Sequence, residues 1–217
     1  MIAAGSVKLR RLARANSETA ALNDTLSSAG AVRHAAGVVP EAPLEQTEHG
    51  LLPDGEGWFA VNARDAQWRH APGRGAICRF EVDVGFPQLG FRITVLQPGE
   101  PMAMYHWEAD QEDFLVVSGE ALLIVEGEER QLRPWDFVHC PAGTRHVIVG
   151  AGNAACVVVG AGARDNSLGS EWGAYTVDET AIRHGAGVAE ETSDQHVAYG
   201  AVAGREPTRY RDGWLPD

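Results

Sequence analysis

One stretch of the chain, from Pro98 to His146, constrains the fold more than any other. It begins and ends with residues that can bind a metal, and short segments rich in β-branched and aromatic residues lie between them. The four candidate ligands are His106, Glu108, Glu112 and His146. A fold that uses all four must bring both ends of the stretch together, as a β-barrel does. We therefore predict a metal-binding β-barrel.

The central part of the chain, which we place at residues 51–165, has the pattern of an all-β domain. Short candidate strands follow one another without helical periods between them, and glycine and proline turns separate them. The segment from Leu122 to Glu128 predicts a strand that runs into a tight hairpin. The predicted strands are 58–62, 76–82, 91–96, 102–107, 114–117, 121–126, 130–132, 137–140, 146–149 and 155–160.

The two ends of the chain differ from this domain. Residues 1–50 are rich in Ala and Ser, and basic residues precede the first acid, Glu18. They predict an N-terminal extension that is either a loosely ordered arm or a basic amphipathic helix for targeting or partner binding, over residues 7–21. Residues 166–217 predict a short helix at 178–185 and then an acidic, loop-rich C-terminal arm. Because this arm keeps Tyr210 and Trp214, we expect it to pack on the barrel or on a neighbouring subunit.

Charge and cysteine content argue against several classes of function. A net charge of −12 opposes binding to nucleic acid or to an anionic membrane surface. The longest uncharged apolar stretch, 147–163, is broken by glycines and predicts two strands and a turn, not a membrane span. The three cysteines form no CxxC pair, which favours a reducing compartment, and we expect a cytoplasmic protein.

The spacing of the candidate ligands fits one shared metal. Residues i and i+2 of a strand point to the same face, so His106 and Glu108 lie together. A hairpin can return Glu112 beside them, and the turn at 141–145 orients His146. Such ligands bind Mn²⁺, Fe²⁺, Zn²⁺, Co²⁺ or Ni²⁺; the oxygens favour Mn²⁺ or Fe²⁺, while raw affinity favours Zn²⁺ or Ni²⁺. Spacing alone also allows an alternative without a metal, in which a strand histidine is only hydrogen-bonded and the acidic residues face solvent.

Two motifs in this stretch resemble those of the cupin superfamily. The first combines glycine, a His-x-His pair, glutamate and a second glycine, and the second contains Pro-x-Gly followed by histidine. The matching residues are Gly99, His106, Glu112 and Gly119 in the first motif and Pro141, Gly143 and His146 in the second. The resemblance implies a double-stranded β-helix, a jelly-roll barrel of six to eight strands with the metal inside one open end. It also implies pairing as a homodimer.

The sequence departs from the family pattern at three positions. Glu108 takes the place of the second histidine, Trp135 that of the second motif's opening glycine, and Gly150 that of its closing asparagine. The resemblance implies that the ligands of one divalent metal per chain are His106, Glu112 and His146. Glu108 would then be either a fourth ligand or a general base.

Strand alternation extends the prediction to the substrate pocket. Met104 is two residues from His106, and Phe114 is two residues from Glu112, so strand alternation points each to the same face as the candidate ligand. We therefore predict Met104 and Phe114 in the pocket wall. His139 and Cys140 are neighbours in one predicted strand, so only one of them can face the cavity. His139 inside would carry protons or bind substrate, whereas Cys140 inside would be a small buried apolar residue.

Three classes of function fit these features. The first is a small metal-dependent enzyme of dioxygenase, decarboxylase or isomerase type that acts on a small polar metabolite, with Glu108 or His139 as proton carrier. The second is a non-catalytic module that binds a small molecule through its metal. The third is a dimerisation scaffold whose N-terminal helix binds a partner. An open metal position with exchangeable water would favour the enzyme over the binding module.

Overall fold

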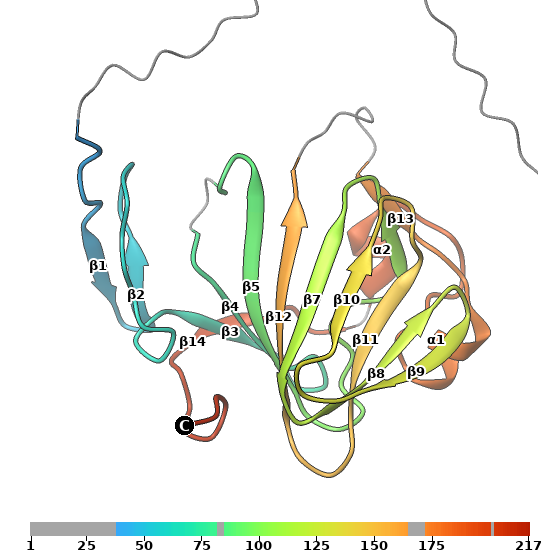
Figure 1. Ribbon diagram of the computed structural model, residues 1–217. Helices are drawn as coiled ribbons and strands as arrows, with labels where there is room; N and C mark the ends of the chain where they lie inside the picture. The colour runs from blue at the N-terminus through green and yellow to red at the C-terminus, as the bar shows by residue number, and fades with distance from the viewer. Residues whose placement is uncertain (1–37, 82–84, 165–171, 201) are drawn as a thin grey trace, which may run out of the picture. The chain divides into compact units, whose positions relative to one another are not determined.

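A computed structural model of the chain describes residues 38–81, 85–164, 172–200 and 202–217. Within these ranges, the strands form a seven-stranded sheet, a five-stranded sheet and a two-stranded hairpin (Figure 1). All pairings between the strands are antiparallel. The predicted all-β, double-stranded β-helix is confirmed. The predicted helix at residues 7–21 lies outside the described residues.

Most strands that are neighbours in a sheet are not neighbours in the sequence. In spatial order, the seven-stranded sheet consists of β10 (Phe137–Cys140), β7 (Glu112–Ser118), β12 (Cys156–Ala163), β5 (Leu89–Leu96), β4 (Ala76–Arg79), β3 (Trp68–His70) and β14 (Glu206–Thr208). The five-stranded sheet consists of β13 (Gly173–Tyr175), β6 (His106–Glu108), β11 (His146–Ala151), β8 (Glu120–Val125) and β9 (Glu128–Leu132), also in spatial order. The hairpin joins β1 (Leu44–Thr47) to β2 (Gly50–Pro53), and the helices are α1 (Glu179–Arg183) and α2 (Gln195–Tyr199).

The main core lies inside the barrel, where alternate residues of both sheets meet. Its buried members include Leu96, Phe114, Val116, Leu123, Ile148 and Val158. Because each fully buried side chain of this kind contributes roughly 1.5–3 kcal/mol, this cluster is the main source of the barrel's stability.

The outer face of the five-stranded sheet is covered by the C-terminal part of the chain. Ala181 of α1 and Ala186 are fully buried and pack on apolar residues of β8 and β11. Asp178 caps α1, because its carboxylate accepts a hydrogen bond from the Ala181 amide at 2.8 Å. The predicted helix at 178–185 is therefore present.

The outer face of the seven-stranded sheet is covered on one side only. Trp68 of β3 is fully buried, and the rings of Tyr210 and Trp214 lie 6.0 and 5.1 Å from it. Further along the same sheet, Phe91 and Phe137 remain exposed. The C-terminal residues thus cover the end of the sheet that contains β3, and β14 extends its edge.

Two tight turns have left-handed backbone at residues other than glycine. In the predicted hairpin between β8 and β9, Glu126 has φ 49° and Gly127 has φ 80°, the pattern of a type I′ turn. Trp135, which replaces the glycine of the second motif, has φ 75°. The turn therefore keeps the conformation that glycine would adopt without strain.

Several elements differ from the strand prediction. At 58–62 only Trp58 forms an isolated bridge, and the segment predicted as 102–107 becomes a strand only at β6. The hairpin β1–β2 crosses the predicted boundary at residue 50. Among the described residues, no helix is long and apolar enough to cross a membrane.

Candidate metal centre

Three strands bring His106, Glu112 and His146 together. Each of these residues is the first of its strand, in β6, β7 and β11 respectively. The two histidines are Cα partners across neighbouring strands, and Glu112 reaches them from the opposite sheet. All three are buried, and one ligand atom from each lies within 4.8 Å of the other two. The structure thus assembles three of the four predicted ligands from residues far apart in sequence.

Backbone carbonyl groups orient both imidazole rings. Nδ1 of His106 lies 2.7 Å from the carbonyl oxygen of Met104, and Nδ1 of His146 lies 3.0 Å from that of Thr144. Because a carbonyl oxygen only accepts hydrogen bonds, we assign the proton of each neutral ring to Nδ1. The lone pair of each Nε2 then points to Glu112 Oε2, at 3.6 Å from His106 and 3.3 Å from His146. This is the tautomer that a metal-binding histidine needs.

The carboxylate of Glu112 is held on one side and lacks a partner on the other. Its Oε1 accepts a hydrogen bond from Arg92 Nη2 at 2.9 Å. Its Oε2 and the Nε2 of His146 are both buried and have no hydrogen-bond partner among the described residues. Buried polar atoms without partners are rare and costly. A divalent cation bound by both atoms would remove this cost, so the residues present fit a metal ion.

The pKa values of these groups show how strongly they interact when only protons can bind. Burial alone lowers the pKa of His106, but Glu108 and Glu112 outweigh it and raise that pKa to about 9. Burial likewise lowers the pKa of His146, whereas Cys140 and Glu112 raise it, again to about 9. For Glu112, burial favours the neutral acid, but the two histidines and Arg92 hold its pKa well below the usual range. Glu112 therefore remains a carboxylate.

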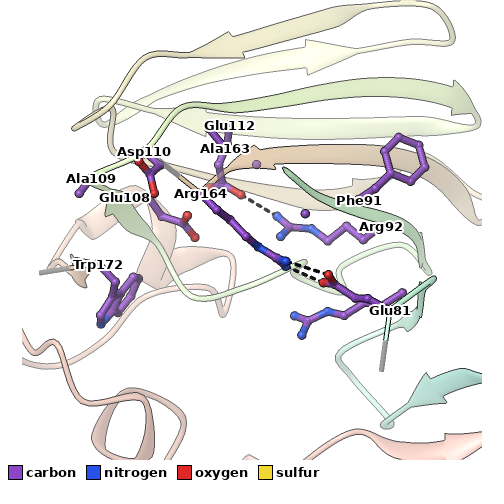
Figure 2. Close-up of a pocket in the computed structure, with 13 residues that line it drawn as sticks. Glu81, Phe91, Arg92, Glu108, Ala109, Asp110, Glu112, Ala163, Arg164 and Trp172 are labelled. Carbon is purple, nitrogen blue, oxygen red and sulfur yellow. Dashed lines mark hydrogen bonds and ion pairs between the residues drawn. The ribbon is translucent and has the colours of Figure 1, made fainter. Parts of the chain in front are cut away.

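Glu108 lies between the buried cluster and solvent. Its Oε1 is 3.6 Å from Nε2 of His106, and its side chain is 31% exposed. It lines a pocket of about 230 Å³ together with Glu112 and Trp172 (Figure 2). At this position its carboxylate is able either to join the metal ligands or to reach a substrate in the pocket.

The pocket is strongly charged. Arg164 donates two hydrogen bonds to Glu81, at 2.5 and 2.8 Å, and Figure 2 shows this pair beside the Arg92–Glu112 pair. The charged residues of its lining are Arg79, Arg92, Arg164, Glu81, Glu108, Asp110 and Glu112.

The two predicted pocket residues belong to different clusters of buried side chains. Phe114 is buried inside the barrel, and its ring centre is 5.4 Å from that of His146. Met104 packs with Tyr175 and Val188, and neither Phe114 nor Met104 lines the pocket beside Glu108. The strand begins only at His106, so the alternation used to place Met104 does not extend back to it.

The structure places Cys140 inside the barrel and His139 outside. Cys140 is 2% exposed and belongs to the main core. The half-exposed side chain of His139 pairs with Asp113 on the outer face of β10 and β7, with Nδ1 2.7 Å from the carboxylate oxygen. Of the two alternatives that strand alternation leaves open, the structure has Cys140 facing inward, so His139 is not in the position that the predicted role of proton carrier requires. A proton carrier for a substrate in the pocket must come from another residue.

Sequence reasoning missed Arg92, which orients Glu112. A signal for it was present, because Arg92 alternates in β5 with Thr94 and Leu96, which are both fully buried. A charged residue on the inward face of a strand needs a partner inside the barrel. The aromatic wall formed by Trp172 had no comparable signal, because Trp172 only precedes the short strand β13, which is recognised through its pairing with β6.

Comparison with known proteins agrees with the motifs. Residues 92–161 match a protein-family profile described as "Cupin domain". A putative sugar phosphate isomerase from Acidithiobacillus ferrooxidans is 23% identical, with 49% of this chain and 69% of that chain covered and a TM-score of 0.42. KdgF from Halomonas sp. is 21% identical, with 52% and 99% covered and a TM-score of 0.42. The polyketide cyclase RemF from Streptomyces resistomycificus is 15% identical, with 49% and 79% covered and a TM-score of 0.42. A search of the curated proteins finds no match.

The profile match spans the whole stretch that carries the two motifs. It begins within β5 and ends within β12, so it contains β6, β7 and β11 and hence all three buried members of the cluster. The resemblance inferred from the motifs is thereby confirmed, and residues 92–161 of this chain form a cupin domain.

Proposed function

We propose that this chain is a metal-dependent enzyme acting on a small polar metabolite, and that His106, Glu112 and His146 bind one divalent cation. One observation carries the metal assignment. Both imidazoles are held by backbone carbonyl groups with Nε2 towards a buried carboxylate oxygen that has no hydrogen-bond partner in the described part of the chain. The two Nε2 atoms and this carboxylate oxygen are all hydrogen-bond acceptors, so they are stable side by side only with protons or a cation between them.

Glu108 is the residue that we propose as proton carrier. A bound divalent cation would supply Lewis-acid polarisation of a substrate oxygen. Glu108 lines the pocket and is partly exposed, so its carboxylate is able to take a proton from a substrate or return one. Isomerisation by proton transfer and protonation after loss of CO₂ both need such a group. We therefore place isomerase and decarboxylase reactions before a dioxygenase reaction.

The donor atoms favour particular metals. Two imidazole nitrogens and one or two carboxylate oxygens suit Mn²⁺ or Fe²⁺, whereas Zn²⁺ would compete through higher affinity, and Ni²⁺ and Co²⁺ bind similar ligands. We propose Mn²⁺ or Fe²⁺ as the working metal. Activity of the protein reconstituted with Zn²⁺ alone would contradict this choice if the Mn²⁺ and Fe²⁺ forms are inactive.

The metal assignment is tested by elemental analysis of the purified protein. We expect about one divalent metal per chain in the wild type and a loss of at least tenfold in affinity in His106→Ala and Glu112→Gln, because each removes one ligand. His139→Ala is the matched control, since it removes a histidine on the outer face of the barrel. A wild-type protein without metal after reconstitution would overturn the assignment.

The role of Glu108 is tested by Glu108→Gln in the metal-loaded protein. We expect metal content to persist and turnover of a substrate to fall by about 10²–10⁴-fold, the usual range for loss of a general acid or base. Glu128→Gln, at an exposed position of the β8–β9 hairpin, is the control for the lost charge. Full turnover in Glu108→Gln would show that Glu108 carries no proton.

One observation favours a second function, a non-catalytic module that binds a metabolite. Because Glu108 Oε1 lies 3.6 Å from His106 Nε2, a small rotation would make it a fourth ligand and complete a four-coordinate site. Water-proton relaxation of the Mn²⁺-loaded protein separates the two functions. Rapidly exchanging bound water supports the enzyme, and its absence supports the binding module.

We also propose that the chain forms a homodimer through the uncovered outer face of the seven-stranded sheet. Phe137, Leu115, Val159 and Ile93 are cross-strand partners in one row of that face, on β10, β7, β12 and β5. Phe137 is 64% exposed. Leu115, Val159 and Ile93 are partly buried, so the row reaches solvent mainly at Phe137, and an apolar strip of this kind favours an interaction surface.

A further inference from the structure

Two arginines lie directly opposite each other at the pocket. Arg79 of β4 and Arg92 of β5 are Cα partners, and both line the pocket beside Glu112. Like charges in this position destabilise a pair of strands unless an opposite charge lies nearby. The arrangement therefore calls for negative charge close to both guanidinium groups.

The carboxylates of the pocket satisfy only part of this need. Arg92 is bound to Glu112, and Arg164 is bound to Glu81 through both of its terminal nitrogens. Arg79 forms no hydrogen bond and no ion pair with any residue that the structure describes. Its guanidinium is thus available to a ligand.

The surroundings of Arg79 disfavour a lone positive charge. The side chain is exposed to the pocket, yet desolvation by the surrounding protein, followed by the charge of Arg92, lowers its pKa, while Glu81 opposes the shift. An anion beside Arg79 would relieve this unfavourable interaction. Because a guanidinium presents a planar pair of donors, a carboxylate or phosphate group would fit it best.

The pocket changes its net charge when the metal binds. Three arginines and four carboxylates line it, so one divalent cation turns a net negative charge of one into a net positive charge of one. A volume of about 230 Å³ lies below the 300–1,000 Å³ that is typical of drug-sized ligands. Gly162 contributes to this space, since a side chain there would extend towards Glu112.

We propose that Arg79 binds the anionic end, a carboxylate or a phosphate, of a small ligand whose other end reaches the metal centre. The inference rests on the proposed function for the metal end of the ligand. Binding of the anionic end of the ligand depends only on Arg79 and its neighbours. Arg79 would thus determine which substrates the pocket accepts.

Three probes that share one carboxylate test this proposal: acetate, malonate and phosphonoacetate. Their affinities are measured by calorimetry on Mn²⁺-loaded protein, for the wild type, for Arg79→Gln and for Arg130→Gln. Arg130 is the matched control, because its exposed side chain lies on β9 and outside the pocket lining. Metal content is measured in parallel for each variant.

We expect the wild type to bind malonate or phosphonoacetate at least tenfold more tightly than acetate. Arg79→Gln should remove that difference with acetate affinity and metal content unchanged, and Arg130→Gln should behave as the wild type. The tighter of the two dianionic probes identifies the preferred anion. Equal binding of all three probes by the wild type, or a difference that persists in Arg79→Gln, overturns the proposal.

Failure of the metal assignment would be visible separately, as protein without Mn²⁺. The titration with phosphonoacetate is then repeated on metal-free wild type and Arg79→Gln. A loss of affinity of tenfold or more in the variant supports the anion site without the metal centre. Equal affinities overturn it.

Discussion

The two buried histidines give the metal-free protein a pH dependence of defined sign. Their folded-state pKa values are raised from 6.5 to about 9, because Glu108 and Glu112 outweigh the effect of burial at His106, and Cys140 and Glu112 do so at His146. A raised pKa adds stability that is fully present below pH 6.5 and is lost as pH rises through about 9. We therefore expect the melting temperature of metal-free protein to fall between pH 6.5 and 9, measured by scanning calorimetry.

The bound metal should reverse this trend, because it replaces the two protons. Metal affinity should rise with pH over the same interval, since the histidines must lose protons to bind a cation. Glu112→Gln removes a charge that contributes to raising both pKa values and should reduce the slope of the stability profile of the metal-free protein. A melting temperature of metal-free wild type that does not change between pH 6.5 and 9 would show that the neighbouring groups do not raise the pKa values of the two histidines.

At the scale of residues, the sequence predicts the ligands better than their surroundings. The motif spacing around His106, Glu112 and His146 is local, and the structure brings these side chains together. Strand alternation predicts that His139 and Cys140 point in opposite directions, but it does not say which face is the inner one. That choice depends on the pairing of β10 with β7, which no local pattern contains.

At the scale of the strand, two glycines of β12 shape the site differently. Gly160 is the cross-strand partner of both Arg92 and Phe114. A Cβ at Gly160 would lie 3.2 Å from the Arg92 side chain and 3.3 Å from the Phe114 ring. A Cβ at Gly162 would lie in ordinary contact, 3.7 Å from Glu112. Both glycines are on the inward face, so they form a matched pair.

We expect opposite effects from alanine at these two positions. Gly162→Ala should stabilise the protein by about 0.4–1 kcal/mol, since alanine reduces the entropy of the unfolded chain. Gly160→Ala should destabilise it by about 1 kcal/mol, through overpacking, and weaken metal binding by displacing Arg92 from Glu112. Urea unfolding and metal titration of both variants give the comparison. Equal stability of the two would exclude a packing role for Gly160.

The strands that the sequence did not predict share one property. Strands β1, β2, β3, β13 and β14 are three or four residues long, and their residues carry little or no alternating pattern. Each is defined by its partner in the sheet, and β14 pairs with β3 across more than 130 residues of sequence. Longer strands such as β5 and β12 carry their own apolar pattern and were predicted.

At the scale of the molecule, the apolar residues on the outer face of the seven-stranded sheet are unequally covered. Tyr210 and Trp214 cover Trp68 at one end. In the row from Ile93 to Phe137, Ile93 packs against the cluster around Trp68, whereas Phe137 at the far end is 64% exposed. A second copy of the chain would cover this row by a symmetric contact, in which the same patch serves both subunits.

The proposed dimer predicts that a charge in this row separates the subunits. Phe137→Asp should convert a dimer into a monomer in sedimentation velocity, because the contact would bury an unpaired carboxylate. Metal content should not change, since Phe137 lies on the face opposite Glu112 and the main core. Ile182→Asp is the control: Ile182 is 48% exposed on α1, over the other sheet. A wild type that remains monomeric at high concentration, or a Phe137→Asp variant that remains dimeric, would exclude this face as the interface.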